Sequence, residues 1–480
     1  MTESVWSKTT AIPEQKVFSG NEEIEVAVIG AGMTGILTAC LLQQAGKQVI
    51  VLEADRIASG QTKNTTAKIT SQHGKIYSQL QKDYGAENAR LYAKANEEAI
   101  AAYQRIIDNN QIECHFKRLP SYLYSTREKK ALQEEAELAA SFGIHAYYTE
   151  ETELPFPIEG AVCFENQAQF HPLEFIKALA KDLTIYEQTK VLSVNGHCIE
   201  TARGHVTAKH IVFATHYPII NIPGFYFVRQ HQERSYVLAV SDVEPLNGMY
   251  YSLEKDGLSL RMEEDVLLLG GGGHRTGQAA ARGTEGYEFL RNMAAKYYPG
   301  YKERACWSAQ DCMPHDNLPF IGRYSIFRPY WYVATGFKKW GMTDAMLSAM
   351  LLCDQICGVQ NPYEKLFTPG RFHLKAGFCA LLKDLGVSVM GLAKGAFHLP
   401  FQGLSSVEPG EGKIIRIGFR RYGCFKDETG KIHRISVRCR HMGCELEWNR
   451  EEQTWDCPCH GSRYDMDGNL IDAPAQTNLK

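Results

Sequence analysis

Hydrophobic and polar positions repeat with two different periods in the first part of this 480-residue chain. Residues 24–30 form a short apolar run rich in β-branched side chains, which is typical of a buried strand. Apolar positions then recur at helical spacing over residues 33–45, and a second apolar run covers residues 48–52, directly before Glu53. The pattern therefore predicts a strand–helix–strand unit near the start of the chain.

The centre of the chain changes from helical spacing to strand-like alternation. Three helices and then two strands are indicated, over residues 86–109, 127–142, 172–183, 184–194 and 205–214. Four short runs follow at residues 236–240, 249–253, 259–262 and 266–269. Their spacing predicts an antiparallel sheet inserted into the α/β unit. A helix over residues 283–298, a strand over 330–334 and a long apolar helix over 343–357 are expected to complete this part.

Composition changes near Pro369, where a stretch rich in Lys, Gly and Ala leads into short strand patterns. We expect four segments, namely a tail over residues 1–20, a large α/β domain over 21–368, a linker with a helix over 369–412 and a small all-β domain over 413–480. The inserted sheet subdomain is expected at roughly residues 90–180 and 225–300. The expected fold class is a Rossmann-like α/β domain with an inserted antiparallel-sheet subdomain, followed by a small all-β domain.

Composition and charge are those of an ordinary globular protein. Hydrophobic residues make up 44% and charged residues 22%, and the formal net charge of −3 gives no reason to expect nucleic acid or an anionic membrane as a partner. We expect no transmembrane segment, because the longest apolar stretch, residues 376–397, is interrupted by Lys383, Asp384 and Lys394. This stretch predicts an amphipathic helix, for which peripheral contact with a membrane is an option. Without a secretory signal pattern, a cytoplasmic location is expected.

Four of the 14 cysteines gather near the end of the chain, between residues 439 and 459. They belong to two short groups, Cys439-Arg-His441-Met-Gly-Cys444 and Cys457-Pro-Cys459-His460-Gly-Ser462. Two Cys–His pairs of this kind can hold zinc, a mononuclear iron or a [2Fe–2S] cluster. Each group has one cysteine more than four-coordinate zinc requires, and hydroxyl donors follow at Ser462 and Tyr464. These features favour the cluster.

The two groups resemble the Rieske domains of the respiratory type. The resemblance implies that one iron is bound by two cysteines and the other by two histidines, namely Cys439 and Cys457, and His441 and His460. It also implies a disulfide between Cys444 and Cys459 that ties the two loops together. Ser462 and Tyr464 stand where this type of domain places hydroxyl donors to a bridging sulfide and a ligand cysteine, which raise the cluster potential.

A glycine-rich turn lies between the first expected strand and helix, and it reads Gly30-Ala-Gly32-Met33-Thr34-Gly35. Gly30 permits the tight turn, Gly32 lets a pyrophosphate approach the backbone, and Gly35 lets the helix pack on the strand. The helix N-terminus offers free N–H groups to phosphates. Glu53 stands where a carboxylate accepts hydrogen bonds from ribose hydroxyls. The motif predicts a dinucleotide site and does not by itself separate FAD from NAD.

Three later stretches favour FAD. They are Lys190-Val191, the strand pattern ending in Ala214-Thr215, and residues 334–343 with Gly336, Gly341, Met342 and Thr343 at the start of the long helix. Together with the glycine turn they resemble the FAD-dependent amino acid and amine oxidoreductases, the family that includes glycine oxidase and sarcosine oxidase. The resemblance spans about residues 20–365. Residues 60–67, which include Thr65, take the place of that family's loop over the phosphates and flavin, with different residues.

Three polar residues are candidates for substrate chemistry. Arg261 lies on an expected strand of the inserted sheet, where the resembling family often presents a carboxylate clamp. Lys339 lies near the expected flavin and could position water or oxygen, and His73 is a further polar candidate. An arginine on a strand is more often exposed to solvent and without a role in binding. Arg261 therefore has two interpretations, a substrate ligand or a solvated surface residue.

The joining of a flavin domain to a Rieske domain resembles a group of bacterial two-domain flavin–Rieske proteins. Because flavin takes two electrons and a [2Fe–2S] cluster carries one, we expect a small amine or amino acid to be oxidised and electrons to leave through the cluster to a quinone or redox protein. Two alternatives remain open. In the first, electrons flow in reverse, from the cluster to a flavin that acts as a reductase or monooxygenase. In the second, the chain is a non-catalytic redox sensor or electron conduit. A Rieske oxygenase is disfavoured, since the sequence suggests no second site of two histidines and one carboxylate.

Overall fold

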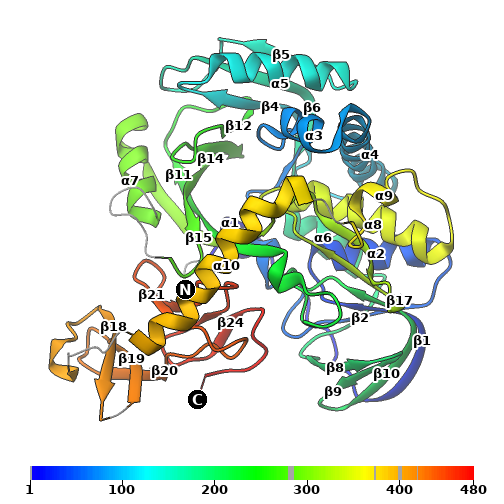
Figure 1. Ribbon diagram of the computed structural model, residues 1–480. Coiled ribbons are helices and arrows are strands. Elements are labelled where there is room, and N and C mark those ends of the chain that lie inside the picture. Colours follow the sequence, from blue (N-terminus) through cyan, green and yellow to red (C-terminus); the bar gives the residue numbers. More distant parts are fainter. Residues whose placement is uncertain (1–2, 279–285, 372–373, 398–402, 419, 480) are drawn as a thin grey trace.

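The computed structural model describes residues 3–278, 286–371, 374–397, 403–418 and 420–479. The chain forms a large part, built around two sheets, and a small β part that follows it in sequence. The long helix α10 (Leu374–Phe397) runs from the large part to the small one (Figure 1). Of its side chains, those of residues 377 and 381–391 are described.

The first sheet is mainly parallel and carries the predicted strand–helix–strand unit. Its order is β16–β17–β10–β1–β2–β7, with β16 antiparallel to β17 and the β8–β9 hairpin added beside β10. The strands are β1 (Gly20–Ile29), β2 (Val49–Leu52), β7 (Thr184–Tyr186), β8 (Val191–Asn195), β9 (Cys198–Thr201), β10 (Gly204–Phe213), β16 (Phe320–Ser325) and β17 (Arg328–Thr335). The single strand expected over 184–194 is two strands, because the chain turns at Gln188, whose φ is +49°.

Helices cover the first sheet at the ends of its strands. Helix α2 packs against α6 and α8, and η1 contacts α6. These elements are α2 (Met33–Gln44), α6 (Pro172–Ala180), α8 (Gly341–Cys357), α9 (Glu364–Phe367) and η1 (Gln61–Asn64). The buried faces of α2 and α8 join the largest hydrophobic core of the molecule.

The second sheet is largely antiparallel, in the order β15–β11–β14–β13–β12–β4–β6–β3, with β5 beside β6 and a parallel pair between β4 and β12. Its strands are β3 (Lys68–Ile69), β4 (Lys117–Ser125), β5 (Ala146–Thr149), β6 (Gly160–Gln169), β11 (Gln230–Ser241), β12 (Met249–Ser252), β13 (Ser259–Glu263), β14 (Val266–Arg275) and β15 (Lys302–Pro314). The expected inserted sheet is therefore present, and it is larger than predicted because β3, β4, β6 and β15 also join it. Its helices are α3 (Ile76–Tyr84), α4 (Ala86–Asn110), α5 (Lys129–Ser141) and α7 (Gly286–Tyr297).

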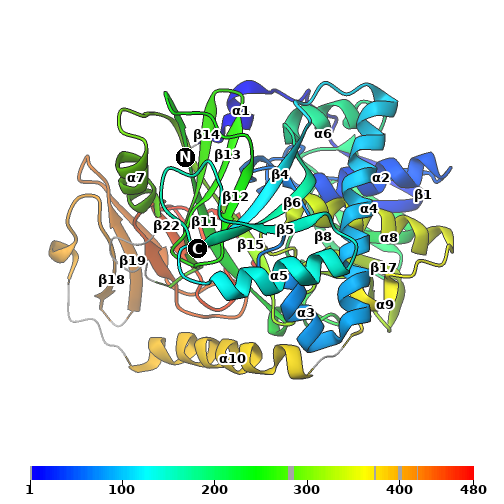
Figure 2. The same ribbon diagram turned by 90° about the horizontal axis from the view of Figure 1, so that it is seen from above.

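The small part contains two antiparallel sheets, one of three strands and one of four. The strands are β18 (Gly412–Ile417), β19 (Arg420–Lys426), β20 (Ile432–Ser436), β21 (Glu447–Asn449), β22 (Thr454–Asp456), β23 (Arg463–Tyr464) and β24 (Leu470–Asp472). Two short turns complete the list of elements. The turn η2 (Tyr226–Val228) belongs to the large part, and η3 (Leu404–Ser406) follows α10 in the sequence. Seen from above, α10 lies along one outer edge of the molecule (Figure 2). The predicted fold class is confirmed.

The N-terminal segment expected as a polar tail instead forms helix α1 (Val5–Thr9) on the large part. Trp6 is fully buried, and its indole N–H donates to the carbonyl of Thr65 at 2.8 Å. The burial of one tryptophan explains why a short segment of mixed composition packs onto the domain. Within the described residues, none of the helices combines the length and apolar character needed to cross a bilayer.

Candidate functional site

The glycine turn forms at the carboxyl end of β1, as predicted. Gly30 has φ +105°, and a Cβ there would lie 2.6 Å from the carbonyl oxygen of Ala214, which directly follows the neighbouring strand β10. At Gly35 a Cβ would collide with the carbonyl of Gly30. Gly32 faces Thr62, whose hydroxyl accepts a hydrogen bond from the N–H of Met33 at 3.0 Å. The turn therefore leaves backbone room above it that any larger side chain would remove.

Glu53 is held firmly at the end of β2. One carboxylate oxygen accepts from the N–H of Ala31 at 2.7 Å, and the other accepts from the N–H of Asp55 at 2.9 Å. Burial raises the pKa of Glu53, and these backbone donors oppose that rise. The carboxylate is thus fixed beside the glycine turn.

A first cavity of about 430 Å³ opens above this turn. The predicted cofactor residues that line it are Gly30, Gly32, Met33, Thr34, Glu53, Thr65, Val191, Thr215, Gly341 and Met342. Three predicted residues do not line it. Gly35 lies inside helix packing, Gly336 takes a turn with φ +79°, and the hydroxyl of Thr343 donates to the carbonyl of Thr70 at 2.9 Å.

A second cavity of about 620 Å³ adjoins the first, under the antiparallel sheet. The two cavities share Thr65, Ala309, Asp311, Lys339 and Met342. The ammonium of Lys339 donates to the hydroxyl of Ser235 at 2.6 Å and to Asp311 at 3.1 Å, with Glu233 3.7 Å away. Burial opposes its charge, but the two carboxylates outweigh burial and raise the pKa of Lys339. A protonated lysine therefore stands where the cavities meet.

The other two substrate candidates lie elsewhere. The Arg261 guanidinium is fully buried, donates to the carbonyl of Ala67 at 3.0 Å and pairs with Glu263, and it is not among the residues that line either cavity. His73 is also outside both linings. Its ring stacks on Trp340 at 4.8 Å, and burial lowers its pKa to about 3. The structure thus brings Lys339, but not Arg261 or His73, to the shared boundary.

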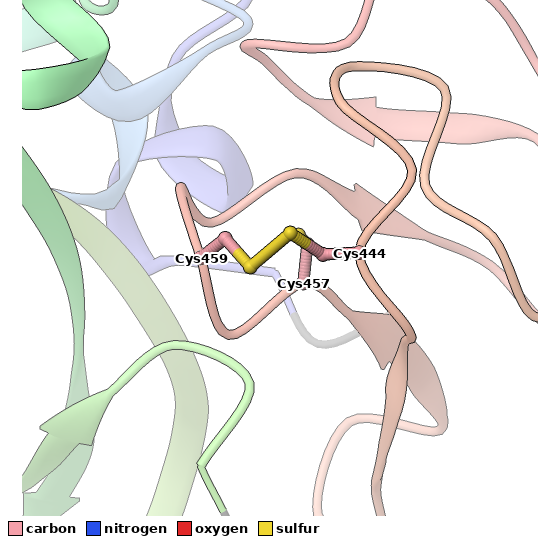
Figure 3. Close-up of side chains that lie close together, drawn as sticks. All are labelled: Cys444, Cys457 and Cys459. Atoms are coloured by element: carbon pink, nitrogen blue, oxygen red, sulfur yellow. A yellow bond between two sulfur atoms is a disulfide. The ribbon is translucent and has the colours of Figure 1, made fainter. Parts of the chain in front are cut away.

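The cysteine and histidine groups come together on two loops of the small part. A disulfide joins Cys444 to Cys459, and Cys457 lies beside it (Figure 3). The Nδ1 atoms of His441 and His460 are 3.2 Å apart. Burial lowers the pKa of His441 to about 4 and that of His460 to about 3, so both imidazoles are neutral near pH 7, as metal ligands must be.

The two remaining sulfurs lie close together and receive hydrogen bonds. The thiol of Cys457 hydrogen-bonds to Cys439, and this bond is the main cause that lowers the pKa of the Cys439 thiol against the effect of burial. The Tyr464 hydroxyl is 3.6 Å from the sulfur of Cys439. The hydroxyl of Ser462 accepts from the N–H of Ala475 at 2.9 Å and contributes to lowering the pKa of Cys439. Two sulfurs and two nitrogens with this polar surround are the donor set of a [2Fe–2S] site.

Comparison with known families agrees with both halves of this arrangement. Residues 25–355 match the family described as FAD dependent oxidoreductase, and residues 400–480 match the Rieske [2Fe-2S] domain. The chain belongs to the FAD-dependent oxidoreductase family and carries a C-terminal Rieske domain. Its cofactors are accordingly FAD and a [2Fe–2S] cluster, which answers the choice that the sequence left open among zinc, mononuclear iron and a cluster.

Relatives of this flavin–Rieske oxidoreductase match it over all or over part of its length. The Rieske 2Fe-2S iron-sulfur protein YhfW of Bacillus subtilis is 37% identical over 494 aligned positions, which cover 100% of this chain and 97% of that protein. Gamma-glutamylputrescine oxidoreductase of Escherichia coli is 26% identical over 213 positions, 40% of this chain and 50% of that protein. Among solved structures, glycine oxidase from Geobacillus kaustophilus superposes with a TM-score of 0.62 at 19% identity, over 73% of this chain and 99% of that chain, a likeness of fold.

The Rieske domain docks on the FAD domain through the edge that carries its histidines. The Nε2 atom of His441 lies 3.0 Å from the amide oxygen of Asn221. Phe227, six residues further along the same loop, places its ring edge-on to His441 and His460, with centroids 6.1 Å and 5.8 Å away. His216 and Ile219, which start this loop, line the first cavity. One short loop thus connects the cofactor cavity of the FAD domain with the histidines of the Rieske domain.

Two glutamines of the second sheet bind the backbone of the Rieske loop. Gln232 donates to the carbonyl of His460 at 2.7 Å, and Gln310 donates to the carbonyl of Gly461 at 2.7 Å. Gly461 has φ +86°, and a Cβ there would lie 2.7 Å from the side chain of Gln232. These contacts fix the loop that holds His460 against the FAD domain.

A buried ion-pair network reinforces the docking. Glu452 of the Rieske domain pairs with Arg234 at 2.6 Å and with Arg463 at 3.0 Å. Burial opposes the charge of Glu452, but the two guanidiniums lower its pKa to about 2. The C-terminal end of the Rieske domain also reaches the first cavity, where Leu470, Ile471, Ala473, Ala475 and Gln476 form part of its wall.

Asp384 anchors the linker helix α10 to the FAD domain. Its carboxylate accepts from His231 at 3.0 Å, from His315 and from Arg275. The fold therefore does assemble two histidines and one carboxylate, within 4.8 Å of one another, which the wide sequence spacing concealed. Because the guanidinium of Arg275 already neutralises Asp384, we assign this group to holding the helix. Within the expected linker, the described part of α10 is therefore packed against the FAD domain.

Sequence reasoning missed the residues that join the two domains and one lysine of the second cavity. Asn221, Glu452 and Asp384 each have a partner more than 100 residues away, namely His441, Arg234 and Arg275, so no local pattern reveals these contacts. Lys68 lines the second cavity. Its surroundings in the sequence, Thr66-Ala67-Lys68-Ile69-Thr70, mix polar and apolar residues, so no local signal marks this lysine as buried.

Proposed function

We propose that this protein is a dehydrogenase of small amines or amino acids that sends the electrons from FAD through its own Rieske cluster to an external acceptor. The observation that carries the proposal is the loop of residues 216–227. It lines the cavity assigned to FAD at one end and contacts both histidines of the Rieske domain at the other. Such continuity supports electron flow inside one chain.

The residues around the first cavity suit FAD. The backbone room at Gly30 and Gly32 and the N-terminus of α2 would hold the pyrophosphate, and the carboxylate of Glu53 would bind ribose hydroxyls. The start of α8, at Gly341 and Met342, would face the flavin end of the cavity, where a helix N-terminus favours negative charge. Gly35, Gly336 and Thr343 would support these parts from behind.

The donor set on the two Rieske loops suits a [2Fe–2S] cluster. Cys439 and Cys457 would bind one iron, while His441 and His460 would bind the other through their facing Nδ1 atoms. Ser462 and Tyr464 would hydrogen-bond to the sulfurs, as the contact of Tyr464 with Cys439 supports.

The second cavity is the substrate site in this proposal. When bound, FAD accepts two electrons from a C–H bond next to nitrogen, and a [2Fe–2S] cluster carries electrons singly. Lys339 keeps its proton beside Asp311 and Glu233, so it offers a fixed positive charge at the boundary between the two cavities. Trp340 and Tyr251 form an apolar wall of the cavity, which restricts water near the reacting bond.

Lys68 supports an amino acid over a plain amine. Its ammonium is buried, donates to the carbonyl of Tyr250 at 2.7 Å and to the hydroxyl of Ser259 at 2.6 Å, and lines the second cavity. Among the residues that the structure describes, no carboxylate lies within ion-pair distance of this ammonium, and nearby Arg261 is already paired with Glu263. An uncompensated buried cation would bind a substrate carboxylate. One relative, gamma-glutamylputrescine oxidoreductase, is named for a compound derived from an amine.

The test is anaerobic mixing of the purified holoprotein with a panel of amines and amino acids, followed by visible absorbance and electron paramagnetic resonance. We expect flavin bleaching together with a reduced-Rieske signal, strongest with amino acids. Bleaching without the cluster signal would contradict internal transfer. If no donor bleaches the flavin or produces the cluster signal, in protein whose cluster dithionite still reduces, the dehydrogenase proposal is contradicted. Electron flow in reverse or redox sensing would then be favoured.

A further inference from the structure

In the described part of helix α10, four large apolar side chains are exposed. Leu382, Leu385, Val389 and Met390 have exposed fractions of 53%, 43%, 63% and 64%. Steps of three and four residues keep Leu382, Leu385 and Val389 on one face of a helix. A surface helix of a soluble domain normally buries its apolar face, whereas this helix exposes these apolar residues to solvent.

The opposite face of α10 is small or polar and touches the protein. Asp384 is held by Arg275 and two histidines, and the carbonyl of Ser388 lies 3.9 Å from the sulfur of Cys459. The carbonyl of Gly391 accepts from the N–H of Glu445 at 3.3 Å, and Gly391 is buried. The packing that fixes the helix therefore uses no large apolar residue of the outer face.

The shape of the helix suits a flat partner. Its 24 residues span about 36 Å, and it lies along an outer edge with the rest of the molecule on one side (Figure 2). An exposed apolar face on a helix that lies along the outside of the molecule has the geometry of helices that lie in the plane of a membrane surface.

The charges on α10 indicate which kind of lipid surface it would contact. The helix sequence contains three lysines, Lys375, Lys383 and Lys394, and one acid, Asp384, which Arg275 neutralises. Although the whole chain has a formal net charge of −3, this segment is cationic, and Lys383 is exposed next to the apolar row. Lysines beside an apolar helix face complement anionic lipid headgroups.

Exposed apolar residues also flank the contact between the two domains. Ile222 and Phe225 are 67% and 46% exposed, and they border Asn221 on its loop. Met442 is 47% exposed and follows His441. The turn η2, which comes directly after Phe225, packs beside α10. Apolar surface is thus found both on α10 and at the histidine edge of the Rieske domain.

We propose that the outer face of α10 binds the surface of an anionic lipid bilayer and so places the Rieske domain next to the membrane. This goes beyond the proposed function, since it concerns where electrons leave and holds whatever the substrate is. A lipid-soluble one-electron acceptor would then be within reach of the docked cluster domain.

The experiment is sedimentation of the purified holoprotein with vesicles of pure phosphatidylglycerol or pure phosphatidylcholine. We expect phosphatidylglycerol to bind it about tenfold or more tightly, with weaker binding as sodium chloride is raised. The double variant Leu385→Ser with Val389→Ser should lose most of this binding. The matched control is Ile326→Ser with Phe327→Ser in the β16–β17 turn, two apolar residues exposed by 81% and 70%, and it should bind as the unaltered protein does.

Three outcomes would overturn the proposal. The unaltered protein could fail to sediment with either vesicle, or the α10 double variant could bind as tightly as the control. Light scattering could instead show a dimer that the α10 double variant abolishes, and the face would then belong to a second copy of the chain. Flavin absorbance and the cluster signal of each variant verify that it is folded, and the comparison of the two lipids in the unaltered protein needs no variant.

Discussion

The outer ring nitrogen of His441 lies 3.0 Å from the amide oxygen of Asn221, so a residue of the FAD domain accepts a hydrogen bond from a histidine of the Rieske domain. In the proposed ligand set Nδ1 of His441 goes to iron, which leaves the hydrogen on Nε2. The bond makes the docked position of the Rieske domain depend on the same histidine that would carry the electron.

Replacing Asn221 by Asp tests this contact. A carboxylate there keeps an acceptor for His441 and adds a negative charge, which disfavours the reduced, more negative cluster. We expect the midpoint potential to fall by tens of millivolts, on the order of 1 kcal/mol. A redox titration followed by electron paramagnetic resonance measures it. Asn195→Asp, at an exposed turn of the FAD domain, serves as control, and equal potentials in the two variants would contradict the contact.

The ion pairs of Glu452 predict a stability defect. Glu452→Gln leaves the buried guanidinium of Arg234 without its carboxylate, whereas Arg463 keeps Asp456 and Asp472. We expect a loss of about 3 kcal/mol in the free energy of unfolding, since uncompensated buried charges carry such costs. Chemical denaturation followed by the Rieske signal reports it. The exposed Glu408→Gln should change the free energy by less than about 0.5 kcal/mol.

The same carboxylate predicts a pH dependence. The pKa of Glu452 is about 2 in the folded protein, below its ordinary value of 4.5. A lowered pKa stabilises the fold above the ordinary value, and this stabilisation disappears as pH falls toward the folded value. The difference in unfolding free energy between the unaltered protein and Glu452→Gln should therefore shrink as pH is lowered from about 5 to about 2. A difference that stays constant across this range would show that Glu452 is not the titrating group.

The buried ammonium of Lys68 in the second cavity leads to a prediction about substrate selection. Lys68→Met should raise the KM for amino acids about tenfold or more and leave the KM of amines without a carboxylate unchanged. Burial, followed by the charge of Arg261, lowers the pKa of Lys68 to about 7, so binding of carboxylates should weaken as pH rises above about 7. Steady-state kinetics across pH check both statements. Lys130→Met, at an exposed position of α5, is the control, and a matching rise in KM for plain amines would contradict the assignment.

The glycine turn predicts the loss of FAD on a single substitution. Gly30→Ala puts a methyl group 2.6 Å from the carbonyl of Ala214 and strains a backbone with φ +105°. Gly46→Ala has a comparable φ of +81° but meets no atom within 4 Å. We expect at least about tenfold weaker FAD binding for Gly30→Ala only, measured as flavin content and by flavin titration of apoprotein. Equal losses in both variants would point to backbone strain alone.

The sequence predicted the parts of the fold that are coded locally. The glycine turn, helix α2 and strand β2 follow from a few adjacent residues, and the fold class, FAD and the [2Fe–2S] cluster are confirmed. Strand β15 was missed, since its 13 residues bury positions on both faces and show no clear alternation. The domain boundaries and the individual site residues stay predictions.

The arrangement of the site depended on contacts that no local pattern encodes. Arg261 lay on the expected strand, but its charge is turned inward to Glu263, because the direction of a side chain depends on the register of the whole sheet. Lys68 entered the second cavity through the pairing of β3 with β6, about 100 residues away in sequence. The docking of the Rieske domain was left open by the sequence for the same reason.

The disulfide between Cys444 and Cys459 lies beneath α10, with both cysteines only 2% exposed. At Gly391 even a Cβ atom would come 2.8 Å from the sulfur of Cys459, so the helix backbone occupies the approach to that atom. Thiol–disulfide exchange requires an attacking thiolate to reach a sulfur directly. We therefore expect small thiols to reduce this bridge slowly as long as α10 covers Cys459.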